Sequence, residues 1–400
     1  MIKYNTKEMA MISEKVKRVI SLLNDANYEA FVVGGSVRDA LIGKAISDWD
    51  ITTNATPEEV KAVFKDFKVI DTGIQHGTVT LRFEKESFEI TTYRVDSEYL
   101  DHRHPKVEFT RSLEEDLKRR DFTMNALAFH PDKGIIDLFE GKEDINRGIV
   151  RSVGDGNQRF EEDALRILRG LRFGAKLGFK IEKNTSVAMF NKKELLAHIS
   201  KERVTVELLQ LLKGIDAEKY LFEYKDLWEV AICGIGKAID MNDYRVFDGL
   251  KDDAVLRLVK LLLPLDISEV NVILSTLKLT NKENKRIADI HVNQHTIFEL
   301  DEVHIKKLLS LLGVELFEDL IEICADNKRE ILEIKSNILN NGYCYKLSML
   351  KITGNELLEL NVLPMNIGKL LSEILVLVIE NKVSNDKETI IKYITKNGLI

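Results

Sequence analysis

Cysteine, proline and long uncharged stretches are all scarce in this 400-residue sequence. The three cysteines, Cys233, Cys324 and Cys344, form no CxxC pair, which argues against a zinc knuckle or a disulfide framework. The five prolines leave room for long helices. Charged residues interrupt every apolar run before it is long enough to span a bilayer, so we expect no membrane protein.

Basic charge is also lacking overall. The formal net charge of −7 excludes a uniformly basic coat for nucleic acid but allows a local basic groove. Segment 1–11 is charged and has no apolar core, so we expect no secretory signal and a cytoplasmic location. With 44% hydrophobic residues the chain is not disordered, and its length suits about two to three domains.

The two ends of the chain differ in their periodicity. Up to about residue 150, short β-type runs predict strands at 31–33, 49–53, 78–83 and 88–93. Thr56, Pro57 and Glu59 have the spacing of a capping box with proline in the first helical turn. After about residue 158 the apolar period is near 3.6, which predicts helices at 163–177, 203–212, 254–263 and 303–312. We therefore expect a mixed α+β fold, with an α/β head followed by an all-helical remainder.

An Asp-x-Asp pair, Asp48 and Asp50, stands at the start of a predicted strand. Residues two apart on a strand share a face, with their Cα atoms about 6.6–7 Å apart. Two such carboxylates suit magnesium, and a pair of metal ions can stabilise both oxygens of a phosphoryl transfer. Most isolated Asp-x-Asp pairs are solvated surface residues, so the pair needs support from its surroundings.

That support comes from a glycine turn upstream. Gly34 and Gly35 follow the first predicted strand and precede a helix, with Ser36 and Arg38 in its first turn. Free backbone N–H groups and an arginine at such a turn can hold phosphate, although a purely structural turn is an equal alternative. No GxxxxGK[ST] motif is present, so this is no Walker A loop.

A third carboxylate, Glu89, lies on a later predicted strand and is either a further site residue or an exposed strand residue. The segment 119–125 contains Arg120, Asp121 and Asn125, whose side chains suit phosphate and sugar hydroxyls. The alternative for this segment is a solvated run of charge.

A nucleobase-reading pair is predicted on the first long helix. Asp163 and Arg166 would be neighbours at i,i+3, and the simple alternative is a surface ion pair. Cytosine and adenine both present an exocyclic amino donor beside a ring-nitrogen acceptor. An aspartate that accepts and an arginine that donates would take these two bases and reject guanine and uracil.

Taken together, five segments resemble the motifs of the class II tRNA nucleotidyltransferases, the CCA-adding enzymes and their relatives. GGSVRDALIG and DWDITT resemble motif A, and RRDFTMNA resembles motif B. DLFEG with Asp144 resembles motif C, EDALRILRGLRF motif D, and ISKER motif E. The resemblance runs in unbroken order from residue 25 to about 215, while the helical remainder matches only in length and character.

The resemblance implies a polymerase-β-like head at 1–150, then a helical neck at 151–215, a body at 216–290 and a tail at 291–400. It implies that the 3′-hydroxyl of tRNA attacks CTP or ATP and that pyrophosphate leaves. Magnesium would be held by Asp48 and Asp50. The implied nucleotide contacts are Gly35, Arg38, Arg120, Asp121, Asn125, Asp163, Arg166, Arg169 and Arg172.

Several alternatives remain within and outside this family. Poly(A) polymerases and enzymes that add only CC or only A share the motifs, and a catalytically inactive RNA-binding scaffold is an alternative of another class. The sequence leaves the oligomeric state unknown. Residues 95–112 read as a long loop bordering the nucleotide pocket, similar to the flexible loop that CC-only enzymes lack, which favours full CCA addition.

Overall fold

The computed structural model describes residues 12–46, 48–99 and 105–398, so segment 1–11, where we expected no secretory signal, lies outside the described residues. Two compact units can be distinguished. Unit 1 comprises Met1–Arg245 and Asn271–Lys278, and unit 2 comprises Val246–Val270 and Leu279–Ile400.

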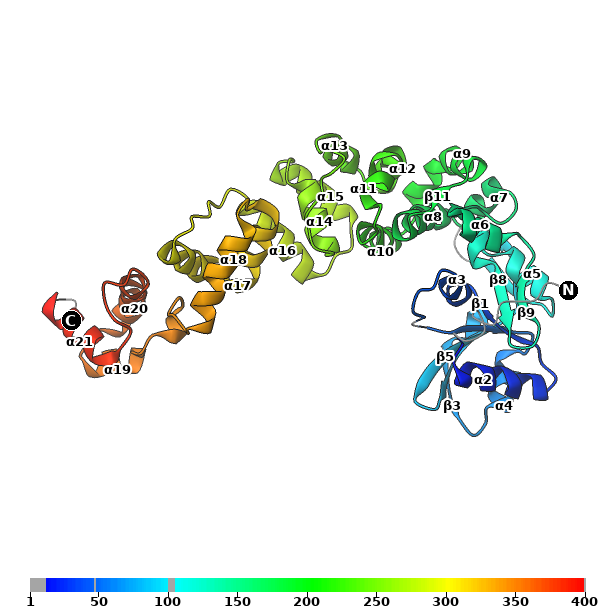
Figure 1. Cartoon of the computed structure of the whole chain (residues 1–400), viewed down its shortest axis with the longest axis horizontal. Helices are drawn as coiled ribbons and strands as arrows, with labels where there is room; N and C mark the ends of the chain where they lie inside the picture. The colour runs from blue at the N-terminus through cyan, green and yellow to red at the C-terminus, as the bar shows by residue number, and fades with distance from the viewer. Residues whose placement is uncertain (1–11, 47, 100–104, 399–400) are drawn as a thin grey trace. The chain divides into compact units, whose positions relative to one another are not determined.

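Unit 1 begins with a mixed sheet (Figure 1). Over the described residues the sheet has seven strands in the order β3-β4-β5-β2-β1-β8-β9. These strands are β1 (Ala30–Val33), β2 (Asp50–Thr53), β3 (Lys68–Gly73), β4 (Thr78–Phe83), β5 (Glu86–Thr92), β8 (Leu127–His130) and β9 (Gly134–Asp137). β2 and β5 pair in parallel, whereas β1 pairs antiparallel with both β2 and β8. The four predicted strands are confirmed, and β3, β8 and β9 were not anticipated.

Helices surround this sheet: α2 (Glu14–Asp25), α3 (Gly35–Leu41), α4 (Pro57–Val63), α5 (Leu113–Lys118), the 3₁₀ turn η2 (Thr123–Asn125) and α6 (Gly141–Arg147). The predicted capping box is confirmed at α4, where the Thr56 side chain accepts from the Glu59 N–H and the Glu59 carboxylate accepts from the Thr56 N–H. One buried cluster, including Phe31, Tyr93 and Leu117, fixes the sheet against α5.

The expectation of a loop at 95–112 is wrong for residues 95–99 and 105–109, whereas residues 110–112 lie outside helices and strands. Strands β6 (Arg94–Tyr99) and β7 (Pro105–Phe109) form an antiparallel ribbon, with Arg94 opposite Phe109 and Asp96 opposite Val107. The paired backbones satisfy each other's hydrogen bonds, so a ribbon forms without the apolar periodicity that sequence analysis looks for. Residues 100–104 lie outside the described residues.

The rest of unit 1 is helical apart from a short parallel pair, β10 (Ile149–Val150) with β11 (Lys180–Ile181). Its helices are α7 (Gly156–Glu162), α8 (Leu165–Leu177), α9 (Lys183–Asn191), η3 (Lys193–His198), α10 (Lys201–Leu212), α11 (Ala217–Phe222), α12 (Lys225–Ala231) and α13 (Ile235–Asp240). α8 packs against α10 and α11. The helix predicted at 163–177 begins at Leu165, because Asp163 has extended backbone dihedrals and ends α7.

Unit 2 is helical throughout its described residues, which confirms the mixed α+β fold class for the chain. Its helices are α14 (Ala254–Leu262), part of α15 (Ile267–Thr276), α16 (Asn281–Val292), α17 (Glu302–Cys324), α18 (Lys328–Asn340), α19 (Gly354–Glu359), α20 (Pro364–Ile379) and α21 (Lys387–Lys396). Separate cores form around Phe317 and around Ile374. No helix of the described chain is both long enough and apolar enough to cross a membrane.

Candidate active site

A glycine turn joins β1 to α3 at one edge of the sheet. Gly34 has φ +70° and ψ −132°, which side chains other than hydrogen rarely allow. A Cβ atom there would also lie 3.1 Å from the Arg120 guanidinium. The turn is therefore glycine for two reasons, its backbone conformation and the close approach of an arginine.

The Asp48–Asp50 segment is fixed against this turn by Ser36. The Ser36 hydroxyl donates to the Asp48 carbonyl oxygen at 3.0 Å and accepts from the Asp50 N–H at 3.3 Å. Ser36 is buried, so these bonds set the position of the backbone between the two aspartates. The serine thus positions the carboxylates.

Negative charge is crowded around Asp50. β2 and β5 are in register with Asp50 opposite Glu89. Burial, then the Glu89 charge, raises the pKa of the Asp50 carboxyl above its usual range, with Arg120 opposing and Asp48 adding to the shift. A bound cation would relieve this repulsion, so the donors suit a divalent metal ion.

The number of protein carboxylates available also suits a magnesium ion. Among the described residues, no three His, Cys, Asp or Glu side chains converge into a complete metal cage. Magnesium in nucleotide-processing sites is held by one or two carboxylates, with water and substrate phosphate filling the remaining positions. Asp48 and Asp50 fit this arrangement, and Glu89 is the nearest register partner for a third carboxylate.

A chain of buried polar contacts leads from the glycine turn to α8. The Arg38 side chain donates to the Asn125 amide oxygen at 2.6 Å, and the Asn125 amide donates to Asp121 at 3.0 Å. Asp121 in turn accepts from Arg169 at 2.8 Å. Burial would raise the pKa of Asp121, but Arg169 and the Asn125 hydrogen bond outweigh it and hold the pKa at about 2.

These residues line a cavity of about 540 Å³ in unit 1. Its walls contain eight arginine and lysine side chains against three aspartates, which makes it an anion site on a chain of net negative charge. The lining residues are Gly34, Gly35, Arg38, Asp50, Arg119, Arg120, Asp121, Asn125, Asp163, Leu165, Arg166, Arg169, Arg172, Phe173, Lys176 and Arg203.

The expectation that Asp163 and Arg166 are i,i+3 neighbours on one helix is wrong. Asp163 lies at the break between α7 and α8 and forms an ion pair with Arg203 at 2.7 Å. Arg166 pairs with Glu162 at 2.7 Å and donates to the carbonyl oxygen of Arg119 at 3.0 Å. Both side chains nevertheless line the cavity, each held by its own partners.

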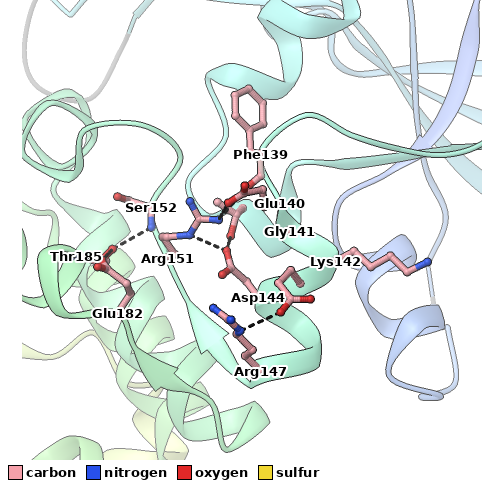
Figure 2. Close-up of polar contacts among 12 residues, drawn as sticks. Phe139, Glu140, Gly141, Lys142, Asp144, Arg147, Arg151, Ser152, Glu182 and Thr185 are labelled. Atoms are coloured by element: carbon pink, nitrogen blue, oxygen red, sulfur yellow. Dashed lines mark hydrogen bonds and ion pairs between the residues drawn. The ribbon is translucent and has the colours of Figure 1, made fainter.

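In the segment that resembles motif C, Asp137 and Asp144 form a set of hydrogen bonds, called the clasp below, that holds helix α6 in place. Asp137 accepts from the backbone N–H groups of Gly141 and Lys142, at 2.8 and 2.9 Å, and so holds the start of α6. Asp144 accepts from Thr123 at 2.5 Å and from Arg151 at 2.9 Å (Figure 2). The clasp therefore ties α6 to the turn η2, which follows the cavity residue Asp121.

The structure brings most of the predicted residues to the cavity. Within the described residues, Asp48, Ser36 and Glu89 are not among its lining residues. Sequence reasoning missed five lining residues: Arg119, Leu165, Phe173, Lys176 and Arg203. All but Lys176 lie inside the quoted motifs, and Lys176 follows Phe173 at i,i+3, so helical spacing was the available signal.

Family models match two parts of the chain. Residues 30–151 match a model described as the poly A polymerase head domain. Residues 178–229 match one described as a probable RNA and SrmB-binding site of polymerase A. With the carboxylates and the basic cavity, these matches make the chain a nucleotidyltransferase.

Full-length relatives define the family more narrowly. A CCA-adding enzyme of Staphylococcus haemolyticus is 34% identical over 96% of this chain and 98% of its own. That of Oceanobacillus iheyensis is 37% identical over 97% and 99%. A crystal structure of the Bacillus stearothermophilus CCA-adding enzyme in complex with CTP has a TM-score of 0.80 at 31% identity, covering 96% of this chain and 97% of that one. The chain belongs to the family of CCA-adding enzymes.

Proposed function

We propose that this protein adds CCA to the 3′ end of tRNA from CTP and ATP, without a nucleic-acid template, and releases pyrophosphate. One observation carries the proposal: a single basic cavity is lined both by the glycine turn and Asp50 of the sheet and by Asp163 and Arg166 at the start of α8. The relatives named as CCA-adding enzymes over their full length support it.

A divalent metal ion belongs to this chemistry, and we infer that it is magnesium held by Asp48 and Asp50. The bound ion would supply charge stabilisation to the reacting phosphate oxygens. Ser36 contributes by fixing the backbone between the two aspartates. Glu89, which lies opposite Asp50 in the sheet, is the candidate for a further catalytic carboxylate.

The triphosphate and ribose would lie against the residues around the glycine turn and on α8. Gly34 and Gly35 allow the backbone to approach, and arginines supply N–H groups that match phosphate oxygens. Asp121 and Asn125, joined by a hydrogen bond, suit the ribose hydroxyls. The arginines assigned to this role are Arg38, Arg120, Arg169 and Arg172, all of which line the cavity.

The base would be read by Asp163 and Arg166. Arg203 holds one carboxylate oxygen of Asp163, while the Leu165 N–H donates to the other at 3.0 Å. A carboxylate has about four acceptor positions, so it can still accept from the amino group of cytosine or adenine. Because both side chains are held by protein partners before the base arrives, little ordering remains to be done on binding.

The assignment extends to the four-domain division 1–150, 151–215, 216–290 and 291–400, with tRNA bound by the later domains in the cytoplasm. The head-domain match at 30–151 supports the first boundary. Addition of A alone, addition of CC alone and poly(A) synthesis are the alternative activities, and an inactive RNA-binding scaffold is the alternative without catalysis.

One extension assay separates these possibilities. The purified chain is given tRNA that lacks CCA, with CTP alone, ATP alone or both, and the 3′ ends are sequenced. The proposal expects CC from CTP alone and CCA from the mixture. Asp50→Asn serves as the inactive control, because it removes a metal-ligand charge with little change of shape. A tRNA that already ends in CC is tested in parallel. CC alone from the mixture, a lone A added only to the tRNA that ends in CC, or poly(A) tails would each replace the proposal by the matching alternative, and no extension of either tRNA would favour the inactive scaffold.

A further inference from the structure

One aromatic ring lies at the meeting point of three arginines in the cavity. The guanidinium carbons of Arg38, Arg169 and Arg172 lie 5.1, 5.5 and 4.3 Å from the centroid of the Phe173 ring. All three distances are within the range of cation–π attraction. Phe173 is 7% exposed and lines the cavity, so the ring is nearly covered by these neighbours.

Three guanidinium charges around one point repel one another unless something holds them. Acidic partners contribute: Arg38 pairs with Asp39, Arg169 with Asp121, and Arg172 with Glu207. For the last pair, burial lowers the pKa of Arg172 and raises that of Glu207, so burial disfavours the charged form of both partners. The ring is a contact that all three arginines share.

A ring also serves an anion site better than another acid would. A guanidinium attracted through its face to a π system keeps its N–H edge for hydrogen bonds, whereas a carboxylate occupies that edge. Each arginine has five N–H donors, and the Asp121 pair uses only the Nε and one terminal nitrogen of Arg169. Contact with the ring leaves the other donors to a ligand.

The Phe173 ring is itself held in place by packing against Phe122. Phe122 is fully buried and meets Phe173 edge-on, with centroids 6.0 Å apart and an interplanar angle of 83°. Gly170, one turn before Phe173 on α8, makes room for Phe122, because a Cβ there would lie 2.9 Å from its ring. The ring position is thus built into the packing of α8.

We propose that Phe173 is a positioning residue for the triphosphate, holding Arg38, Arg169 and Arg172 so that their remaining N–H groups converge on the phosphates of the incoming nucleotide. The inference rests on the proposed function for the identity of that nucleotide. Because CTP and ATP carry the same triphosphate, Phe173 serves both equally and takes no part in choosing the base.

Two substitutions of the same residue test this role. Phe173→Leu keeps an apolar side chain but removes the ring, and Phe173→Tyr keeps the ring. For Phe173→Leu the KM for CTP and for ATP should rise by the same factor, about tenfold, while kcat changes much less. Phe173→Tyr should restore both values to near those of the parent. A leucine variant with unchanged KM, a rise for one nucleotide only, or a tyrosine variant as impaired as leucine would overturn the proposal.

A second measurement separates this inference from the proposed function. Binding of inorganic tripolyphosphate to the full chain, measured by calorimetry without tRNA, should weaken about tenfold in Phe173→Leu. Phe64→Leu, the same change at a fully buried phenylalanine of α4's C-terminal cap, should leave it unchanged. If the parent failed to extend tRNA but bound tripolyphosphate more tightly than Phe173→Leu, the proposed function would be contradicted and the role of Phe173 supported. Equal tripolyphosphate binding by parent and Phe173→Leu would refute the role.

Discussion

At the residue scale, Asp163 and Arg166, the two side chains proposed to read the base, are held by different protein partners, so each can be tested by its own substitution. Asp163→Ala and Arg166→Ala should raise incorporation of UTP and GTP relative to CTP and ATP, because each base-edge contact is worth about 1–3 kcal/mol of discrimination. Competition between nucleotides on one tRNA measures the ratio. If the rate fell equally for all nucleotides and the selectivity stayed unchanged, both residues would have only a structural role, in their ion pairs.

The low pKa of Asp121 predicts that part of the protein's folding stability is lost in acid. Its folded pKa of about 2 lies below its ordinary value, so the stabilising ionised form is fully present above about pH 4 and is lost as the pH falls toward 2. Asp121→Asn should cost about 2 kcal/mol at pH 7, because it leaves the half-buried Arg169 without its charge partner. Urea unfolding measures this cost. A difference from the parent that persisted undiminished at pH 2 would contradict the assignment.

How far sequence reasoning reached depends on the kind of contact. The glycine turn, the Asp-x-Asp pair and the arginines of α8 were predictable, because each depends on residue types at short, fixed spacings in the sequence. The partners of Asp163 and Arg166 were not, since α7 ends at Glu162 and α8 begins only at Leu165, so that Asp163 is not on the helix that carries Arg166. The contact of Arg38 with Phe173 was also out of reach, because it joins residues far apart in the chain.

At the scale of elements, helix α8 contains glycines at positions where a larger side chain would collide with a packed neighbour. A Cβ on Gly174 would lie 2.3 Å from the ring of Tyr220 on α11, and Tyr220 is fully buried. Gly174→Ala should therefore destabilise by about 1–3 kcal/mol, despite the better helix propensity of alanine. Thermal unfolding followed by circular dichroism measures the change.

A matched control is available on α20. A Cβ on Gly368 meets no atom within 4 Å, so Gly368→Ala should stabilise its own unit by up to about 1 kcal/mol. If both substitutions raised the unfolding temperature, helix propensity and not packing would decide the effect at these sites.

The ribbon β6–β7 gives a second prediction at this scale. The register allows residues 98–105 to be replaced by an Asn-Gly turn while the pair Ser97–Lys106 is kept. We expect this variant to add two C residues and then stop, because something beyond the fixed Asp163 and Arg166 must reshape the pocket for a purine. Sequencing of the tRNA ends decides. Addition of A at the parental rate, or equal failure at C, would contradict the role of the ribbon.

At the scale of the whole molecule, the cavity and the helical cores around Phe317 and Ile374 belong to different compact units. All sixteen cavity residues lie in unit 1, and both of those cores lie in unit 2. A chain with separate cores need not unfold in one step, so a single unfolding temperature is not assured for it. Ligand binding offers a way to tell the two units apart.

CTP should raise the unfolding temperature of unit 1 alone. At about one hundred times its dissociation constant a ligand stabilises the folded form by about 2.7 kcal/mol. Both tryptophans of the chain, Trp49 and Trp228, lie in unit 1, so tryptophan fluorescence follows that unit while calorimetry follows both. With CTP the fluorescence transition should move up by roughly 5–10 °C, and a second calorimetric transition should stay in place. UTP at the same concentration should move it less if Asp163 and Arg166 select the base as proposed. A fluorescence transition that ignores CTP, or two transitions that rise together, would contradict the placement of nucleotide binding within unit 1.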